Sequence, residues 1–279
     1  MSTKEISVRK ASGEEELFDL SKLESSLHNA GASRAAIKKV IDGIDKWIFD
    51  GVTTKLLYTK AFSLLRKTQK TSATKYKLKR AIYDLGPSGY PFEAFVGQIF
   101  ERLGYQIETG IMVRGHCLSH EMDVIATNKK EQHIMECKFH RDQGSRVGVQ
   151  VPLYVKSRVD DIIRKRERSD DFTGLKFSIW VVTNTRFSTD AIQFARCSGI
   201  KLLAWDFPRG KGLKELVEKV EIFPVTILTH LLKKHKMTLL DKGIVSCSQL
   251  YEQKEILNEF HLSSRKQKAL IEELQGICD

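Results

Sequence analysis

Two short stretches decide the fold of this chain: His120-Glu121-Met122-Asp123-Val124-Ile125-Ala126 and His133-Ile134-Met135-Glu136-Cys137-Lys138. Each has the length and the apolar content of a β-strand, and the segment between them, 128–131, is polar and turn-like. Two strand-like runs separated by a short polar turn predict a β-hairpin. This hairpin is the frame on which the candidate chemistry of the chain is placed.

The register of the hairpin follows from the length of its loop. A four-residue loop pairs Thr127 with Gln132 and, counting back, places Asp123 opposite Glu136. Directly opposed residues share a sheet face, with Cβ atoms roughly 4.5–5.5 Å apart, and Lys138 points to the same face because side chains alternate along a strand. Facing carboxylates favour a divalent cation, since Mg²⁺ is commonly held by one or two carboxylates plus substrate phosphates. The alternative is an exposed sheet face on which both carboxylates pair with Lys138 or with arginines.

The composition is that of a globular protein with an excess of positive charge. The 279 residues are 41% hydrophobic and carry a net charge of +11. Residues 1–88 hold 17 Lys and Arg against 10 Asp and Glu, whereas residues 213–279 hold 10 of each kind. The densest run, 66–80, has seven basic residues and no acidic one. Such a run favours a polyanionic partner, either a nucleotide or a nucleic acid, and a solvated helix face is the alternative.

The sequence shows no targeting signal and no pattern of cysteine pairing. No run of eighteen apolar residues is present, so no membrane span is expected, and the first residues lack the apolar core of a signal peptide. The five cysteines are scattered and form no CxxC pair, which argues for a reducing compartment and against structural zinc. We therefore expect a cytoplasmic protein with no membrane partner. A zinc site at His116, Cys117 and His120 is an alternative, although their spacing matches no standard zinc pattern.

Two breaks divide the chain into three segments. The stretch 86–91 contains two prolines and two glycines, and 208–212 contains one proline and two glycines, so neither continues a helix. The predicted domains are 1–88, 89–212 and 213–279. The first is small and mostly helical after a β-strand start, and the third consists of short helices. The second alternates strands and helices, which predicts an α/β sandwich with a mixed sheet.

More of the central segment forms an ordered pattern around the hairpin. In chain order the pattern contains Phe92-Glu93, Leu103-Gly104-Tyr105, Asp123-Val124-Ile125, Glu136-Cys137-Lys138 and Gln150-Val151-Pro152-Leu153-Tyr154. In this order the residues resemble the PD-(D/E)xK nuclease superfamily, and most of all its Mrr-type restriction endonuclease branch. The resemblance covers roughly residues 89–207 and implies a restriction-endonuclease-like fold.

This resemblance implies a divalent-metal-dependent deoxyribonuclease that hydrolyses phosphodiester bonds. Its expected catalytic residues are Glu93, Asp123, Glu136, Lys138 and Gln150, and the expected ligands of Mg²⁺ or Mn²⁺ are Asp123 and Glu136. Pro152 fits only the first turn of a helix, so Gln150 is expected at or near the helix start. The sequence departs from the pattern at Glu121, where the branch often has glycine, so Glu121 is a possible extra ligand. His120 or His140 near the scissile phosphate is a further alternative. Double-strand cutting in this superfamily commonly needs two active sites, which implies a homodimer or a higher homo-oligomer.

A second resemblance covers the first segment. Its motifs are Val8-Arg9-Lys10-Ala11-Ser12-Gly13, Phe18-Asp19-x-x-Lys22-Leu23 and Tyr76-x-Leu78-x-Arg80-Ala81-Ile82. They resemble the ATP-cone, the adenine-nucleotide-sensing regulatory domain of ribonucleotide reductases. The resemblance implies binding of ATP or dATP by Arg9, Lys10, Lys75 and Arg80, with Lys22 as an additional candidate. Ala11 occupies the position of the usual arginine, so the alternative is a cone fold retained for DNA contact or oligomerisation.

The third segment contains short helices, one of them expected over 225–234. The helices loosely resemble helix-hairpin-helix or SAM-like modules, and a DNA-binding version would bind phosphate at a helix N-terminus. Arg265, Lys266 and Lys268 would assist such binding, whereas the zero net charge favours contact with protein. Together the three segments predict a metal-dependent DNA endonuclease that is regulated by adenine nucleotide and acts in restriction or defence. The alternatives are a nucleotide-dependent DNA-binding regulator and an oligomeric scaffold, each with an inactive nuclease fold.

Overall fold

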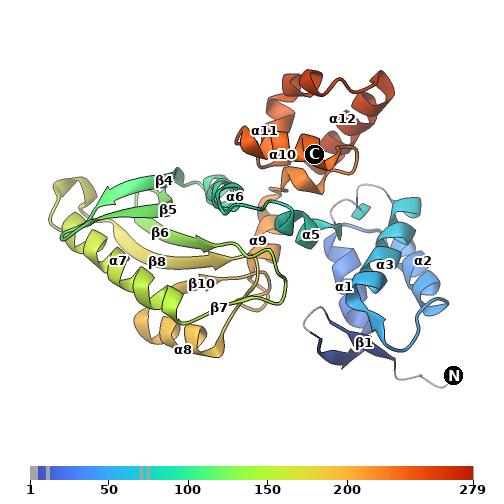
Figure 1. Ribbon diagram of the computed structural model, residues 1–279, viewed down its shortest axis with the longest axis horizontal. Coiled ribbons are helices and arrows are strands. Elements are labelled where there is room, and N and C mark those ends of the chain that lie inside the picture. Colours follow the sequence, from blue (N-terminus) through green and yellow to red (C-terminus); the bar gives the residue numbers. More distant parts are fainter. Residues whose placement is uncertain (1–5, 11–12, 70–71, 74–75, 279) are drawn as a thin grey trace.

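The computed structural model describes residues 6–10, 13–69, 72–73 and 76–278. Figure 1 shows three groups of elements: an N-terminal helical unit, a central sheet with helices on both faces, and a C-terminal cluster of helices. The predicted α/β class with a mixed sheet is confirmed for the central group. Within the described ranges, no helix is both long enough and apolar enough to cross a membrane.

The central sheet has five strands in the order β10-β8-β6-β5-β4. Their bounds are β4 (Gln106–Arg114), β5 (Ser119–Thr127), β6 (Glu131–Lys138), β8 (Lys176–Thr183) and β10 (Lys201–Leu203). β4, β5 and β6 are antiparallel neighbours, whereas β6, β8 and β10 run parallel. The predicted hairpin, β5 and β6, is therefore within the antiparallel part of the sheet, and its second strand lies at the centre.

Helices cover both faces of this sheet, as Figure 1 shows. α6 (Tyr90–Arg102) lies on one face, and α7 (Gln150–Arg166) and α8 (Thr189–Ser198) lie on the other. The strand β8 is buried on both sides, because Val181 packs toward α7 while Val182 packs toward α6. Its sequence is accordingly an apolar run without alternation. A short parallel pair, β7 (Arg146–Val147) and β9 (Arg186–Phe187), and a 3₁₀ turn, η1 (Asp170–Phe172), complete the domain.

The N-terminal unit is mostly helical with a small sheet, as predicted. Its elements are β1 (Ser7–Arg9), β2 (Glu15–Leu17), α1 (Leu20–Asn29), α2 (Arg34–Asp45), β3 (Val52–Thr53) and α3 (Thr54–Thr68). Its three strands form a sheet in the order β2-β1-β3. Asp19 caps α1 by accepting a hydrogen bond from the Ser21 backbone N–H at 2.9 Å. The unit has a hydrophobic core of its own, centred on Leu27, Val40, Ile44 and Leu65.

A short helix, α5 (Leu78–Tyr83), does not contribute to that core. Its buried residues Leu78 and Ile82 belong to a hydrophobic cluster that continues through α6 into the C-terminal helices. The helix packs against η2 (Val225–Ile227), and the Thr226 hydroxyl donates a hydrogen bond to the Ala81 carbonyl at 2.5 Å. Residues 78–85 thus pack with elements that lie beyond the predicted boundary at residue 88.

The C-terminal cluster joins the central domain through α9 (Leu213–Val220), which packs on α6. After η2 come α10 (Lys233–Asp241), α11 (Cys247–Glu252), η3 (Lys254–Phe260) and α12 (Ser264–Cys278). The expectation of one helix over 225–234 is wrong. The backbone N–H groups of Thr229 and His230 donate to the Glu273 carboxylate at 2.8–3.1 Å, so this acceptor from α12 replaces the carbonyls of a helix.

Candidate active site

The hairpin has the predicted register, and it opens where the candidate site begins. Thr127 pairs with Gln132, and the ladder of paired residues ends at Val124 and Met135. Two residues after Met135, the backbone N–H of Cys137 donates to Asp123 Oδ2 at 2.7 Å. The Asp123 carboxylate therefore lies at the point where β5 and β6 separate.

Glu136 is the most enclosed charge of the site. It is 3% exposed, which excludes the alternative of an exposed sheet face. Its Oε1 lies 2.5 Å from Lys138 Nζ, and its Oε2 lies 3.0 Å from Arg158 Nη1. The Tyr154 hydroxyl donates to Oε1 as well. A buried carboxylate is tolerated when it is paired and hydrogen-bonded, and these three donors meet that requirement.

Two of these donors come from one face of α7. Gln150, Tyr154 and Arg158 follow one another at intervals of four residues, which places them on one side of a helix. The helix begins at Gln150, as Pro152 indicated, and the Gln150 side chain is exposed. Arg158 also donates to the Glu121 backbone carbonyl of β5. Sequence reasoning missed Arg158, although the continued four-residue spacing after Gln150 and Tyr154 was the signal that pointed to it.

The carboxylates of the site repel one another. Burial, together with the negative charges of Asp123 and Glu136, raises the pKa of Glu93 in the first turn of α6 to about 7. Burial and the charge of Glu136 raise the pKa of Asp123 to about 6. Burial alone would lower the pKa of Lys138, but hydrogen bonds with Glu136 and Tyr154 outweigh it and raise the pKa well above its usual value. Negative charge is thus concentrated beside one firmly protonated lysine.

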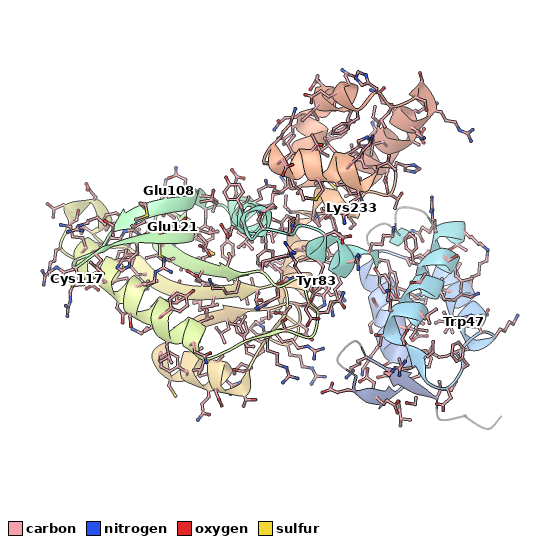
Figure 2. All side chains as sticks on the ribbon, viewed as in Figure 1. Trp47, Tyr83, Glu108, Cys117, Glu121 and Lys233 are labelled. Carbon is pink, nitrogen blue, oxygen red and sulfur yellow. The ribbon has the colours of Figure 1, made fainter. Side chains whose placement is uncertain are left out.

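The structure brings together four of the five predicted catalytic residues. Glu93, Asp123, Glu136 and Lys138 interact with one another, while Gln150 lies at the start of the neighbouring helix. Glu121 is exposed on β5, where Figure 2 labels it, and it adds the smallest of the repulsions that act on Glu93. Among the described residues, no three His, Cys, Asp or Glu side chains form a ready-made metal cage. The donor set fits Mg²⁺ in its usual arrangement, in which one or two carboxylates act together with substrate phosphates.

The histidines near the hairpin have structural partners. His120 Nε2 lies 2.8 Å from Asp161 Oδ2, and the Cys117 backbone N–H donates to Asp161 Oδ1 at 2.8 Å. His140 is held by Asn184, whose Oδ1 accepts from the His140 backbone N–H at 2.8 Å. The contact with Asp161 gives His120 a role in the turn between β4 and β5. Figure 2 shows Cys117 at that end of the sheet.

The residues expected to bind nucleotide do not form one group. Lys10 Nζ lies 2.8 Å from Glu16 Oε2, and Lys22 Nζ lies 3.3 Å from the same oxygen. Arg80 is on α5 and pairs instead with Asp84 at 3.0 Å, away from β1 in Figure 1. Arg9 is exposed on β1. Lys75 and Ala11 lie outside the described residues.

Two family models match this chain. The model described as "Restriction endonuclease" of the Mrr catalytic type matches residues 86–208, and the model "AF1548-like, C-terminal" matches residues 223–278. An uncharacterized protein of Archaeoglobus fulgidus is 31% identical over 183 residues, which are 65% of this chain and 99% of that protein.

One solved structure agrees with these matches. The crystal structure of AF1548, a protein of unknown function, is 30% identical with a TM-score of 0.55, and the similarity covers 68% of this chain and 98% of AF1548. The MspJI restriction endonuclease in complex with a 27-mer oligonucleotide is more distant, at 15% identity and a TM-score of 0.33 over 62% of this chain and 36% of that one. The chain therefore belongs to the AF1548-like family, with a restriction endonuclease domain at residues 86–208 and an AF1548-like C-terminal domain at residues 223–278.

Proposed function

We propose that this protein is a divalent-metal-dependent DNA endonuclease. The observation that carries the proposal is the cluster of Asp123, Glu136 and Lys138, with Glu93 beside it, inside the domain that the restriction endonuclease model matches. Its carboxylates repel one another in the absence of metal, which is the electrostatic condition for binding a dication.

The residues have separate roles in the proposed reaction. Asp123 and Glu136 would hold Mg²⁺ or Mn²⁺, with Glu93 as an additional carboxylate close to them. A bound metal ion supplies polarisation of the scissile phosphate and a lowered pKa for an attacking water. The ammonium of Lys138 would stabilise negative charge on the phosphate as it develops. Tyr154 and Arg158 hold the Glu136 carboxylate in place from α7, and the exposed Gln150 would contact DNA.

The nuclease proposal is tested by cleavage of plasmid DNA in Mg²⁺ or Mn²⁺. Removing a charge-stabilising group from an active site costs about 100-fold or more in rate, so we expect at least that loss for Lys138→Met and for Asp123→Asn. Lys129→Ala, in the exposed hairpin turn, is the matched control and should cut at the wild-type rate. Wild-type cleavage by Lys138→Met would refute the proposal. DNA binding by the wild-type chain without any cleavage would indicate the DNA-binding regulator instead.

We also propose that the N-terminal unit is an ATP-cone that binds ATP or dATP. A cavity of about 230 Å³ lies beside Glu16, Lys22 and Tyr58. It is smaller than the roughly 300–1,000 Å³ of typical small-molecule sites. Since Lys10 and Lys22 are both paired with Glu16, phosphate groups would enter by replacing that carboxylate.

Calorimetry with ATP and dATP tests the nucleotide proposal. Lys22→Ala should weaken binding about tenfold or more, because an interaction with a charged group contributes about 1.5–3 kcal/mol. The control is Lys38→Ala on the exposed surface of α2. An absence of heat with either nucleotide would remove nucleotide regulation and leave the nuclease proposal standing. We further propose a homodimer for cutting both strands and a place in restriction or defence, and light scattering with and without DNA tests the dimer.

A further inference from the structure

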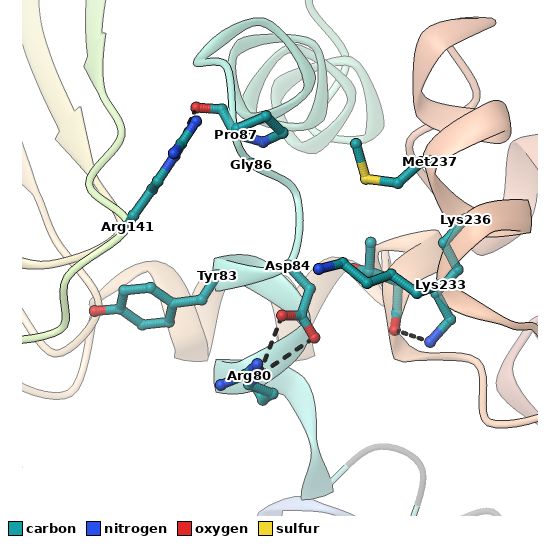
Figure 3. A pocket seen from close by; sticks show the side chains of 10 residues that line it. Arg80, Tyr83, Asp84, Gly86, Pro87, Arg141, Lys233, Lys236 and Met237 are labelled. Atoms are coloured by element: carbon teal, nitrogen blue, oxygen red, sulfur yellow. Dashed lines mark hydrogen bonds and ion pairs between the residues drawn. The ribbon is translucent and has the colours of Figure 1, made fainter.

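A cavity lies where α5, the central domain and the C-terminal helices meet. It has a volume of about 590 Å³ and is lined by α5, by the segment that leads into α6, by the loop after β6 and by α10. Figure 3 shows the side chains of Arg80 and Asp84 from α5, Arg141 from the loop, and Lys233 and Lys236 from α10 around it. The volume is within the roughly 300–1,000 Å³ of small-molecule sites.

The lining of this cavity is unbalanced in charge. It contains four basic side chains and one carboxylate, Asp84, which is paired with Arg80 at 3.0 Å. No ion pair formed by the described residues involves Arg141, Lys233 or Lys236. Lys236 is held against the wall, because its ammonium donates to the Thr226 carbonyl at 2.7 Å. Positive charge therefore accumulates in a concave site, and such sites attract anions.

The surroundings of Lys236 favour the binding of an anion beside it. Burial lowers the pKa of its ammonium and the positive charge of Lys77 lowers it further, while the carboxylates of Asp84 and Glu273 partly offset the shift. An anion bound in the cavity beside Lys236 would offset the cost of keeping its ammonium charged.

We propose that the junction cavity binds a phosphate-bearing ligand of nucleotide size through Arg141, Lys233 and Lys236. Arginine and lysine are the side chains that bind phosphate, by bidentate hydrogen bonding and as a point charge respectively. The phosphate could belong to a free nucleotide or to the backbone of bound DNA. This site is separate from the cavity beside Lys22 in the N-terminal unit.

The cavity adjoins both segments that carry the candidate active site. Arg141 is three residues after Lys138, and its Nε donates to the Pro87 carbonyl at 3.3 Å. Pro87 precedes α6, the helix that carries Glu93. A ligand that binds Arg141 in the cavity would therefore act on the contact between these two segments. An effect of this ligand on cleavage rests on the proposed nuclease function, whereas binding of the ligand to the cavity does not.

Calorimetry with inorganic triphosphate and with ATP tests the free-ligand source. The full-length Lys22→Ala protein is the background, so that binding at the N-terminal cavity is weakened and contributes less to the heat. In that background, Lys233→Ala and Arg141→Ala should each weaken binding at least tenfold. Lys234→Ala is the matched control, because it removes the same charge from the adjacent exposed position outside the cavity, and it should leave the affinity unchanged.

The salt dependence of DNA binding, measured without divalent metal, tests the backbone source. Each lost phosphate contact reduces the slope of log affinity against log salt by about 1, so Lys233→Ala should show this reduction relative to Lys234→Ala. Loss of triphosphate binding alone assigns the site to a free nucleotide, and a lowered slope alone assigns it to DNA. If Lys233→Ala and Lys234→Ala match in both measurements, the proposal is overturned. Neither measurement requires cleavage, so the result is independent of the nuclease proposal.

Discussion

Glu136 shows how a single buried charge shapes the surroundings of the hairpin. Its two oxygens are engaged by Lys138, Tyr154 and Arg158. Lys138 alone could not satisfy both oxygens, and an unsatisfied buried acceptor carries a desolvation penalty of about 1–3 kcal/mol. The role of α7 at this site is therefore to supply Tyr154 and Arg158, which complete the hydrogen bonding of Glu136 on β6.

Removal of the arginine tests this role. We expect Arg158→Ala to lower the free energy of unfolding by about 1–3 kcal/mol, because Glu136 Oε2 loses its donor. Cleavage should fall as well, since the carboxylate is no longer fixed. Urea denaturation of the metal-free protein measures the first effect. Arg164→Ala, exposed on the same helix, should change neither property, and equal stability of the two variants would contradict this account of Glu136.

Glu93 gives the metal-free protein a characteristic pH dependence. Its pKa is raised from 4.5 to about 7 by burial and by the charges of Asp123 and Glu136. Between these two values the folded state binds more protons than the unfolded state, so the contribution of Glu93 to stability is lost as the pH rises through this window. Glu93→Gln should flatten the decline of stability between pH 4.5 and 7. The control Glu101→Gln, exposed on α6, should not, and urea denaturation with a chelator present measures both.

At the scale of elements, local signals determined what could be predicted. The polar turn at 128–131 fixed the pairing of Thr127 with Gln132. This pairing depends on neighbours in the sequence. The separation of β5 and β6 at Asp123 could not be predicted from them, because it depends on a side chain that takes the N–H of Cys137 from the ladder.

Contacts distant in sequence account for the other differences. The helix expected over 225–234 is interrupted because Glu273, more than forty residues later, accepts from the backbone of Thr229 and His230. Arg158 reaches Glu136 only when α7 has docked on the sheet. Helical spacing could indicate that Arg158 shares a face of α7 with Gln150 and Tyr154, but it could not show that this face contacts Glu136.

The β4–β5 connection gives a prediction at this scale. Asp161 of α7 is hydrogen-bonded to the His120 side chain and accepts from the backbone N–H groups of Cys117 and Leu118, and these bonds, that of His120 first, hold its pKa well below the usual range. Asp161→Ala should therefore speed amide hydrogen exchange at Cys117 and Leu118 and lower the melting temperature. Asp160→Ala, which removes only an exposed pair with Lys156, is the control. Unchanged exchange in Asp161→Ala would show that this connection is stable without its anchor.

At the scale of the whole molecule, one hydrophobic core joins segments that the composition separates. The Gly- and Pro-rich stretch at 86–91 indicated a domain boundary, but residues 78–85 precede it and pack with η2 and α6. The buried cluster continues from α5 through η2 to α12, and its members include Ile82, Val225 and Leu274. A composition rich in glycine and proline therefore indicates the backbone conformation of the linker. It does not indicate which hydrophobic core the helices on either side join.

This shared core leads to opposite expectations for the two ends of the chain. A protein that lacks residues 1–76 loses a unit with its own core, so it should fold cooperatively and keep any DNA cleavage, but it should lose the proposed response to ATP through the N-terminal cavity. A protein that lacks residues 213–279 exposes the buried faces of Leu85 and Phe95, and exposed core surface of this kind leads to aggregation. Thermal unfolding, size-exclusion chromatography and plasmid cleavage with and without ATP compare the two. Apolar burial is the main favourable term in folding, so the loss of this shared core should lower stability. If the protein that lacks residues 213–279 unfolds cooperatively at the wild-type temperature, the shared hydrophobic core is not one folding unit.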